Sequence, residues 1–111
     1  PESSLIGADA GEMAGIGKNG VALAGSLADV EDAFDLLIDF TFPDLTLENL
    51  AFCSQNGKAV IIGTTGMTDA EKEQVRMAAE KTSVVFAPNM SVGINVMLDL
   101  VHKAASVRLR C

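Results

Sequence analysis

Three short segments of the chain carry groups that suit the binding of a small polar ligand: Phe40-Thr41, Gly63-Thr64-Thr65-Gly66 and Ala87-Pro88-Asn89-Met90. The glycines of the second segment let the backbone turn sharply and approach a ligand closely. Its threonines bring hydroxyl and N–H donors for phosphate, ribose or carboxylate oxygens, and the third segment adds an asparagine amide on a turn that proline stiffens. Each segment alone is also ordinary turn sequence. The interpretation therefore depends on where the fold places the three together.

Each segment follows a continuous apolar run, and these runs predict a sheet. They are Leu36-Leu37-Ile38, Val60-Ile61-Ile62 and Val84-Val85-Phe86. Continuous rather than alternating apolar residues are typical of internal parallel strands that helices cover on both faces. The carboxyl ends of parallel strands lie at one edge of the sheet, where such folds bind ligands. We therefore expect the three segments to meet at that edge.

Helical patterns separate the runs. The first is expected to begin near Pro43, because proline is tolerated at a first helical position, and to end before Gly57. The second begins with the capping box Thr68-Asp69-Ala70-Glu71, and its apolar face consists of Val75, Ala78 and Ala79. The third starts at Ser91 and is apolar over most of its circumference. Its narrow polar stripe consists of Asn95, Asp99, His102 and Ser106. The alternation of strands and helices predicts an α/β fold with a doubly wound, Rossmann-like parallel sheet.

The first 25 residues are rich in glycine and are expected to form a loop, followed by a short strand over residues 21–24. Within them, Gly15-Ile16-Gly17-Lys18-Asn19-Gly20 satisfies the dinucleotide-binding pattern letter for letter. That motif requires a buried strand before it and a helix after it, so that a pyrophosphate meets the helix N-terminus. Neither context is present, so we interpret these residues as a surface loop.

The composition excludes several classes of protein. The 111 residues carry a net charge of −7, which argues against a groove for nucleic acid. No apolar run approaches the ~20 residues needed to span a bilayer, and no basic-then-apolar leader is present. We expect no membrane partner and a cytoplasmic location. Cys53 is expected to be a buried helical thiol and Cys111 is terminal, and since neither has metal-ligand spacing, no metal site is predicted.

Five longer segments carry a family resemblance. They are Ser3-Ser4-Leu5-Ile6-Gly7, Asp9-Ala10-Gly11-Glu12, Asp39-Phe40-Thr41-Phe42-Pro43, Ile62-Gly63-Thr64-Thr65-Gly66 and Phe86-Ala87-Pro88-Asn89-Met90-Ser91-Val92-Gly93-Ile94-Asn95-Val96. In order and spacing they resemble the dihydrodipicolinate reductase family over nearly the whole chain. The tail Val107-Arg108-Leu109-Arg110-Cys111 departs from the expected continuation.

The resemblance implies which residues bind a cofactor, because in the family the Gly-Thr-Thr and Ala-Pro-Asn segments line the nicotinamide side of the site. The matching residues are Gly63, Thr64, Thr65, Ala87, Pro88, Asn89 and Met90, with Phe40 and Thr41 as a second tier. Thr65 is also expected near the substrate carboxylate, since the substrate must lie against the nicotinamide. Met90 stands where the family often has Phe, and Phe42 where many members have Arg, which puts a charged contact from position 42 in doubt.

The resemblance further implies that the chain is an internal fragment. Residues 1–91 would be part of the dinucleotide-binding domain, and residues 92–111 the connecting helix that starts a substrate and tetramerisation domain. The Gly-rich first strand-turn-helix, and the residue that selects NADH or NADPH, would lie upstream. The catalytic histidine pair and lysine would lie downstream, so no catalytic residue is expected here. His102, alone on the polar stripe, is interpreted as a solvated helix residue.

The implied activity is reduction of 4-hydroxy-tetrahydrodipicolinate to tetrahydrodipicolinate with NADPH or NADH, by a homotetramer, in lysine (diaminopimelate) biosynthesis. Alone, the fragment is expected to be inactive and to aggregate through its last helix. Three alternatives remain. A phosphoacceptor receiver domain would need a Lys after the last strand, where Pro88-Asn89 stands. Composition does not exclude an aspartate- or homoserine-type nicotinamide dehydrogenase, against which only the segment resemblance argues. The missing Gly-rich loop argues against a non-catalytic nucleotide-binding module.

Overall fold

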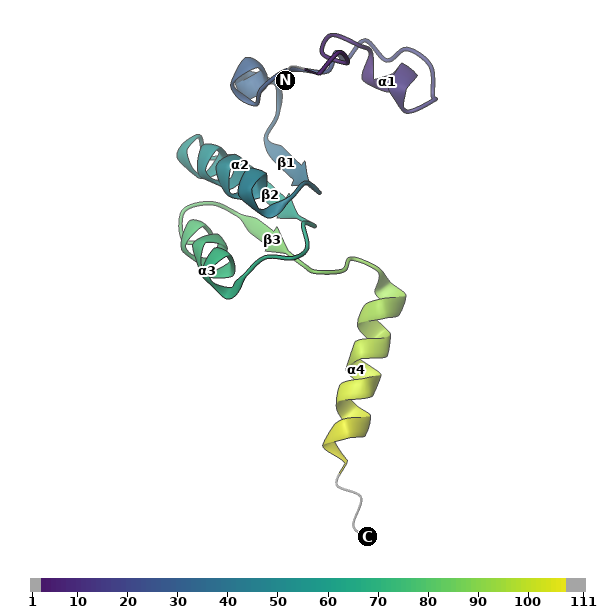
Figure 1. The fold of residues 1–111 in the computed structure, drawn as a ribbon, viewed down its shortest axis with the longest axis vertical. Coiled ribbons are helices and arrows are strands. Elements are labelled where there is room, and N and C mark those ends of the chain that lie inside the picture. The colour runs from purple at the N-terminus through teal and green to yellow at the C-terminus, as the bar shows by residue number, and fades with distance from the viewer. Residues whose placement is uncertain (1–2, 108–111) are drawn as a thin grey trace. The chain divides into compact units, whose positions relative to one another are not determined.

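The structure, a computed structural model, describes residues 3–107. Within these residues, three parallel strands form the only sheet. They are β1 (Leu36–Asp39), β2 (Ala59–Ile62) and β3 (Val84–Phe86), in the order β1-β2-β3 (Figure 1). In the register, Asp39 lies opposite Ile62, and Ile62 opposite Phe86. The prediction of three parallel strands, from their apolar runs, is confirmed.

Two helices connect the strands. Helix α2 (Pro43–Gln55) has proline in its first turn, where the missing N–H removes no helical hydrogen bond. Helix α3 (Asp69–Ala78) begins at the predicted capping box, in which Glu71 N–H donates to the Thr68 hydroxyl and the Glu71 carboxylate accepts from Thr68 N–H. The hydroxyl and amide of Thr68 hold the pKa of Glu71 below its ordinary value. Both predicted helices are confirmed.

The core lies between these helices and one face of the sheet (Figure 1). It consists of Leu50, Cys53, Val60, Ile62, Met67 and Val75, each less than a tenth exposed. The side chains of Leu36, Ile38 and Val85, which point to the other face, are 45%, 62% and 57% exposed. Both crossovers proceed in the same direction along the sheet, and right-handed crossovers of that kind place their helices on the same side. The predicted Rossmann-like α/β class is therefore confirmed as an incomplete sheet, with α2 and α3 on one face, while the expectation that all three strands are internal is wrong for the described chain, in which only β2 is internal.

Helix α4 (Val92–Ser106) begins at Ser91, as predicted, where the Ser91 hydroxyl accepts from Ile94 N–H. Every side chain of the helix is exposed in the described structure, including His102 on the predicted polar stripe. Lys103 and Asp99 form an ion pair of 2.6 Å on its surface. Among residues 3–107, no helix has the length and apolar character needed to cross a membrane.

Of the described residues, 3–35 form one compact unit and 36–107 another. The first unit contains the short helix α1 (Ala10–Met13) and a 3₁₀-helix (Ala28–Ala33). The Asp9 carboxylate caps α1 and also accepts from the N–H groups of Asn19 and Gly20, and these backbone donors, Asn19 first, keep its pKa below the ordinary value. The strand expected over residues 21–24 is wrong, because only a single bridge forms, between Asp9 and Ala22.

Candidate functional site

The sheet brings the three candidate segments to one edge. Past the end of β1, Gly63 N–H donates to the carbonyl oxygen of Asp39 at 2.8 Å. Past the end of β2, Ala87 N–H donates to the carbonyl oxygen of Ile62 at 3.3 Å. The ladder of hydrogen bonds therefore continues beyond the strands, and the segments that begin at Phe40, Gly63 and Ala87 start side by side. Their predicted convergence is confirmed, while their role in binding a cofactor stays a prediction.

Gly63 lies against the ring of Phe40. A Cβ atom added at Gly63 would overlap the ring, with Cδ1 of Phe40 only 2.6 Å away. The backbone of Gly63 does not have positive φ, so this close approach, rather than a special conformation, is what requires glycine. Gly66, with φ of 82°, does need the left-handed region, and it turns the chain away from the sheet. Gly66 thus has the turn expected of it, whereas Gly63 makes room for the Phe40 ring, and the expected approach to a ligand stays a prediction.

The two threonines of this turn differ in what they can offer a ligand. Thr64 is only 2% exposed, and its hydroxyl bonds to the hydroxyl of Thr46 at 2.7 Å. The expectation that the Thr64 hydroxyl is free for a ligand is therefore wrong. Side chains alternate along an extended chain, so Thr64 points to the same covered side as Ile62. Thr65 points the other way and is exposed, which leaves its hydroxyl accessible.

A buried carboxylate organises this edge of the sheet, and the sequence reasoning assigned it no role. Asp39 is 2% exposed, and its Oδ1 accepts from the Thr41 N–H at 2.9 Å and the Thr41 hydroxyl at 2.6 Å. The Thr64 hydroxyl lies 3.4 Å from the same oxygen, and Asn49 Nδ2 donates to Oδ2 at 3.0 Å. Thr46, fully buried, links the hydroxyls of Thr41 and Thr64. An acidic residue at the end of an apolar strand was the signal in the sequence, since a buried charge needs partners.

The hydrogen bonds keep this carboxylate ionised. Burial by itself raises the pKa of Asp39, but the bonds from Thr41 and Asn49 outweigh it and bring the pKa below the ordinary value of 3.8. Burial, with a further contribution from the Asp39 charge, raises the pKa of the Cys53 thiol. Cys53 is fully buried and therefore has the predicted structural role, whereas Cys111 lies outside the described residues.

The third segment is held by the start of α4. The Asn89 side-chain oxygen accepts from Ser91 N–H at 2.8 Å, which leaves its amide nitrogen without a partner among residues 3–107. Asn95 Nδ2 donates to the carbonyl oxygens of Asn89 and Ser91 at 2.9 and 2.8 Å. Pro88, Asn89 and Met90 are exposed. The Asn89 amide and the Met90 thioether are therefore both accessible at this edge.

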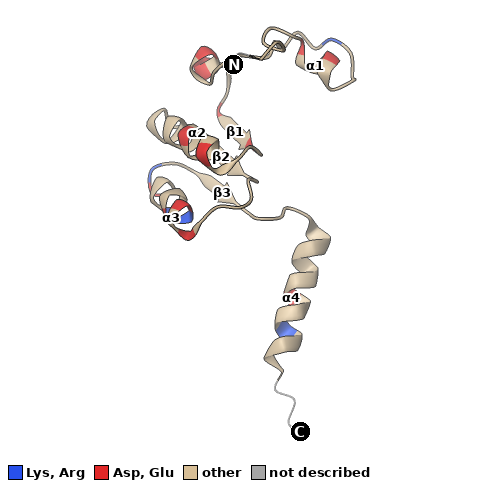
Figure 2. Cartoon of the chain, viewed as in Figure 1, with Lys and Arg blue, Asp and Glu red and all other residues tan. Residues whose placement is uncertain are grey.

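The edge carries no positive charge of its own. Residues 40–43, 63–67 and 87–91 include neither Lys nor Arg, and the loops that follow the strands are uncharged in Figure 2. An anionic cofactor would therefore meet backbone N–H groups, the Thr65 hydroxyl and the Asn89 amide. Such neutral donors, together with the exposed Phe40 ring, fit the amide, ribose and ring of a nicotinamide nucleoside better than they fit a pyrophosphate.

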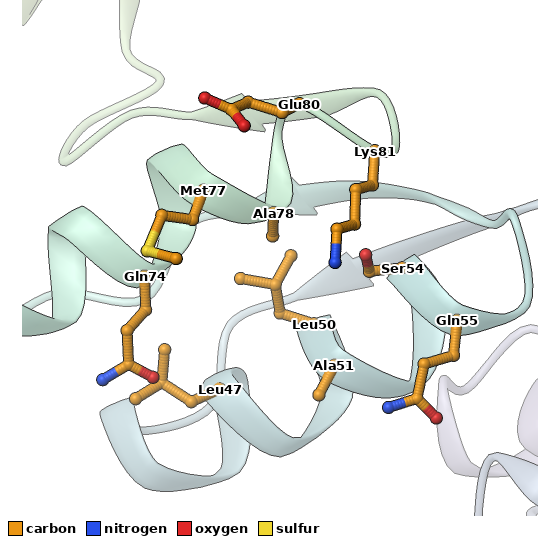
Figure 3. Close-up of a pocket in the computed structure, with 10 residues that line it drawn as sticks. All are labelled: Leu47, Leu50, Ala51, Ser54, Gln55, Gln74, Met77, Ala78, Glu80 and Lys81. Carbon is orange, nitrogen blue, oxygen red and sulfur yellow. The ribbon is translucent and has the colours of Figure 1, made fainter.

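A groove between α2 and α3 lies apart from the candidate edge. It has a volume of about 300 Å³, and Leu47 and Leu50 of α2 face Met77 and Ala78 of α3 across it (Figure 3). None of the three strand-end segments lines it. This groove is therefore separate from the candidate edge.

The Gly15–Gly20 pattern has the loop context predicted for it. Gly15, Gly17 and Gly20 all have positive φ, and the chain continues into extended backbone rather than a helix. A pyrophosphate would therefore find no helix N-terminus at this position. The interpretation as a surface loop agrees with this geometry.

A parallel sheet with its crossover helices and a Gly-, Thr- and Asn-bearing carboxyl edge defines the nucleotide-binding domain of a Rossmann-like α/β protein. Residues 1–90 match the family described as dihydrodipicolinate reductase, N-terminus. Because the match spans 90 of 111 residues, the chain belongs to the dihydrodipicolinate reductase family. It is thus part of an oxidoreductase and has that family's NAD(P)-binding type of fold. The domain boundary at 91/92 remains a prediction.

Proposed function

We propose that the enzyme containing this chain reduces 4-hydroxy-tetrahydrodipicolinate to tetrahydrodipicolinate in lysine (diaminopimelate) biosynthesis. The observation that carries the proposal is the convergence of Phe40, Gly63 and Ala87 at one sheet edge in a chain of this family. NADH or NADPH supplies the hydride when bound. Everything that the chain itself contributes is binding and orientation.

Most of the predicted cofactor residues have a specific role in this proposal. Gly63 makes room for the Phe40 ring, Gly66 bends the turn beside the nicotinamide, and Thr65 offers a hydroxyl to the nicotinamide or to the substrate carboxylate. Asn89 supplies a free amide nitrogen, while the ring of Phe40 and the thioether of Met90 give apolar contact. The set comprises Phe40, Thr41, Gly63, Thr64, Thr65, Ala87, Pro88, Asn89 and Met90, in which Thr64 takes part through its backbone.

Several wider features belong to the same proposal. The substrate is a small molecule, the complete enzyme is a cytoplasmic homotetramer, and its acid catalyst comes from residues beyond this chain. Exposed Val92, Val96 and Leu100 of α4 support a role for this helix in joining a further domain, because isolated apolar helices are rarely left in water.

The proposal is tested by turnover. The protein expressed from its complete reading frame is mixed with the condensation product of pyruvate and aspartate semialdehyde, and the absorbance of NADH or NADPH is followed separately. We expect consumption only when that product is present. Consumption with aspartate semialdehyde alone would instead indicate a homoserine-type dehydrogenase, and consumption with oxaloacetate and ammonia an aspartate-type one. Cofactor binding without consumption in either case would indicate a non-catalytic nucleotide-binding module.

The Thr65→Val variant tests whether the cofactor binds beside Thr65. We expect it to raise the KM for the reduced nicotinamide by about tenfold, the loss that follows from one misplaced contact. The matched control is Ser83→Ala, which removes an exposed hydroxyl from the residue before β3, at the opposite edge of the sheet. Equal KM values for both variants would contradict the assignment of Thr65.

A further inference from the structure

The Asp39 carboxylate bonds to groups from three different parts of the candidate edge. Thr41 belongs to the segment after β1, Thr64 to the turn after β2, and Asn49 to the second turn of α2. The backbone carbonyl of Asp39 also accepts from Gly63 N–H at 2.8 Å. A single residue therefore ties the turn after β2 to the end of β1 through both its main chain and its side chain.

Because Asp39 is buried, its carboxylate needs hydrogen-bond donors from the protein. A carboxylate that is 2% exposed must have its oxygens satisfied by donors, because an unpaired buried charge is strongly unfavourable. The donors here are two hydroxyls, one backbone N–H and one amide, and no cation is among them. If the charge is lost or one oxygen becomes a donor, these groups must reorient together.

The carboxylate itself is too buried to touch a ligand at the edge. Residues next to its partners at the edge are accessible: Phe40 is 65% exposed and Thr65 is exposed. Any effect of Asp39 on a cofactor must therefore pass through the segments whose inner ends it holds.

We propose that Asp39 is a positioning residue, whose buried carboxylate fixes Phe40-Thr41 and the turn Gly63-Thr64-Thr65-Gly66 in the geometry that accepts the nicotinamide. This rests on the proposed function of the edge as the cofactor site. Neutral donors bind weakly unless they are held in place, so a site without Lys or Arg depends more on such preorganisation.

The decisive variant is Asp39→Asn in the complete protein. It keeps the size of the side chain, but it removes the charge and replaces one acceptor oxygen with a donor, so the Asn49 amide must turn over to keep its hydrogen bond. Asp39→Asn with Asn49→Asp reverses the pair and restores that hydrogen bond. The matched control is Asp44→Asn, which removes an exposed carboxylate from the first turn of α2.

The readout is the Kd for NADH and NADPH, measured by fluorescence titration of the reduced nicotinamide without substrate. We expect Asp39→Asn to raise the Kd by about tenfold or more, as misplacement of binding groups does. The double variant should return to within about threefold of wild type, and Asp44→Asn should match wild type. An unchanged Kd for folded Asp39→Asn, or a double variant no better than the single one, would overturn the proposal.

A second variant covers the case in which Asp39→Asn does not fold. Thr46→Val is isosteric, keeps the Asp39 charge and removes only the hydroxyl that links Thr41 to Thr64. We expect a Kd raised by about threefold or more, with the protein folded; an unchanged Kd would overturn the proposal. The titration needs no substrate, so it separates failure of this inference from failure of the proposed reaction.

Discussion

Gly63→Ala tests the close approach between the strand-end turn and the Phe40 ring. The added Cβ would overlap three ring atoms, of which Cδ1 would be 2.6 Å away. Alanine is compatible with the backbone of Gly63, whose φ is not positive, so the overlap is the only obstacle. Overpacking typically costs about 1–3 kcal/mol. Because Phe40 is 65% exposed and can swing away, we expect the lower end, about 1 kcal/mol, in the free energy of unfolding.

The assay is urea denaturation of the complete protein, with the Phe40→Ala background as the second arm of a double-mutant cycle. Without the ring, Gly63→Ala should no longer destabilise and should stabilise by about 0.5 kcal/mol, because alanine restricts the unfolded chain. The matched control is Gly93→Ala in α4, where the nearest atom is the Ser91 hydroxyl at 3.8 Å. It should be neutral or stabilising. A Gly63→Ala cost that persists undiminished in the Phe40→Ala background would refute the reasoning.

Three further predictions concern single groups. The folded pKa of Asp39 lies below 3.8, so its contribution to stability is full above that value and is lost as the pH falls through the folded pKa. The free energy of unfolding in urea, measured between about pH 5 and pH 2, should therefore depend less on pH for Asp39→Asn than for wild type. Identical pH dependences would contradict this. Thr68→Ala removes the cap of α3 and should lower the free energy of unfolding by about 1 kcal/mol, whereas Thr68→Ser should retain it. His102→Asn, on the exposed face of α4, should leave kcat within about twofold of wild type, and a loss of several orders of magnitude would make His102 catalytic.

The sequence was sufficient to predict those parts of the fold that depend on local chemistry. The three apolar runs became strands, Pro43 began α2, and the Thr68 and Glu71 pair formed the capping box. Each of these signals acts within a few residues, through propensity or a side-chain hydrogen bond to nearby backbone. The strand ends therefore fixed which segments would meet at the edge.

Features that depend on packing were harder to predict. Continuous apolar runs indicated two covered faces, but the direction of both crossovers leaves Ile38 and Val85 exposed in the described chain. The short strand expected after Gly20 needed a regular partner strand, and its pairing with residues 7–10 is limited to a few backbone hydrogen bonds and one bridge, between Asp9 and Ala22. Periodicity reports what a segment can bury and does not report what is present to cover it.

The candidate site was predicted as a set of segments rather than as a set of contacts. Alternation from Ile62 would have placed the Thr64 side chain on the covered face, and that signal was missed. The roles of Thr46 and Asn49 could not be predicted from the sequence. These residues lie one turn apart on α2, and they reach the hydrogen-bond network of Asp39 only after the helix packs on the sheet.

Amide hydrogen exchange of the complete protein, with and without reduced nicotinamide, tests most directly the claim that this sheet edge binds the cofactor. Binding should slow exchange in peptides that contain residues 63–66 and 87–90. It should leave the groove between α2 and α3, represented by residues 74–81, unchanged. Protection confined to other peptides, with none at residues 63–66 or 87–90, would contradict the account.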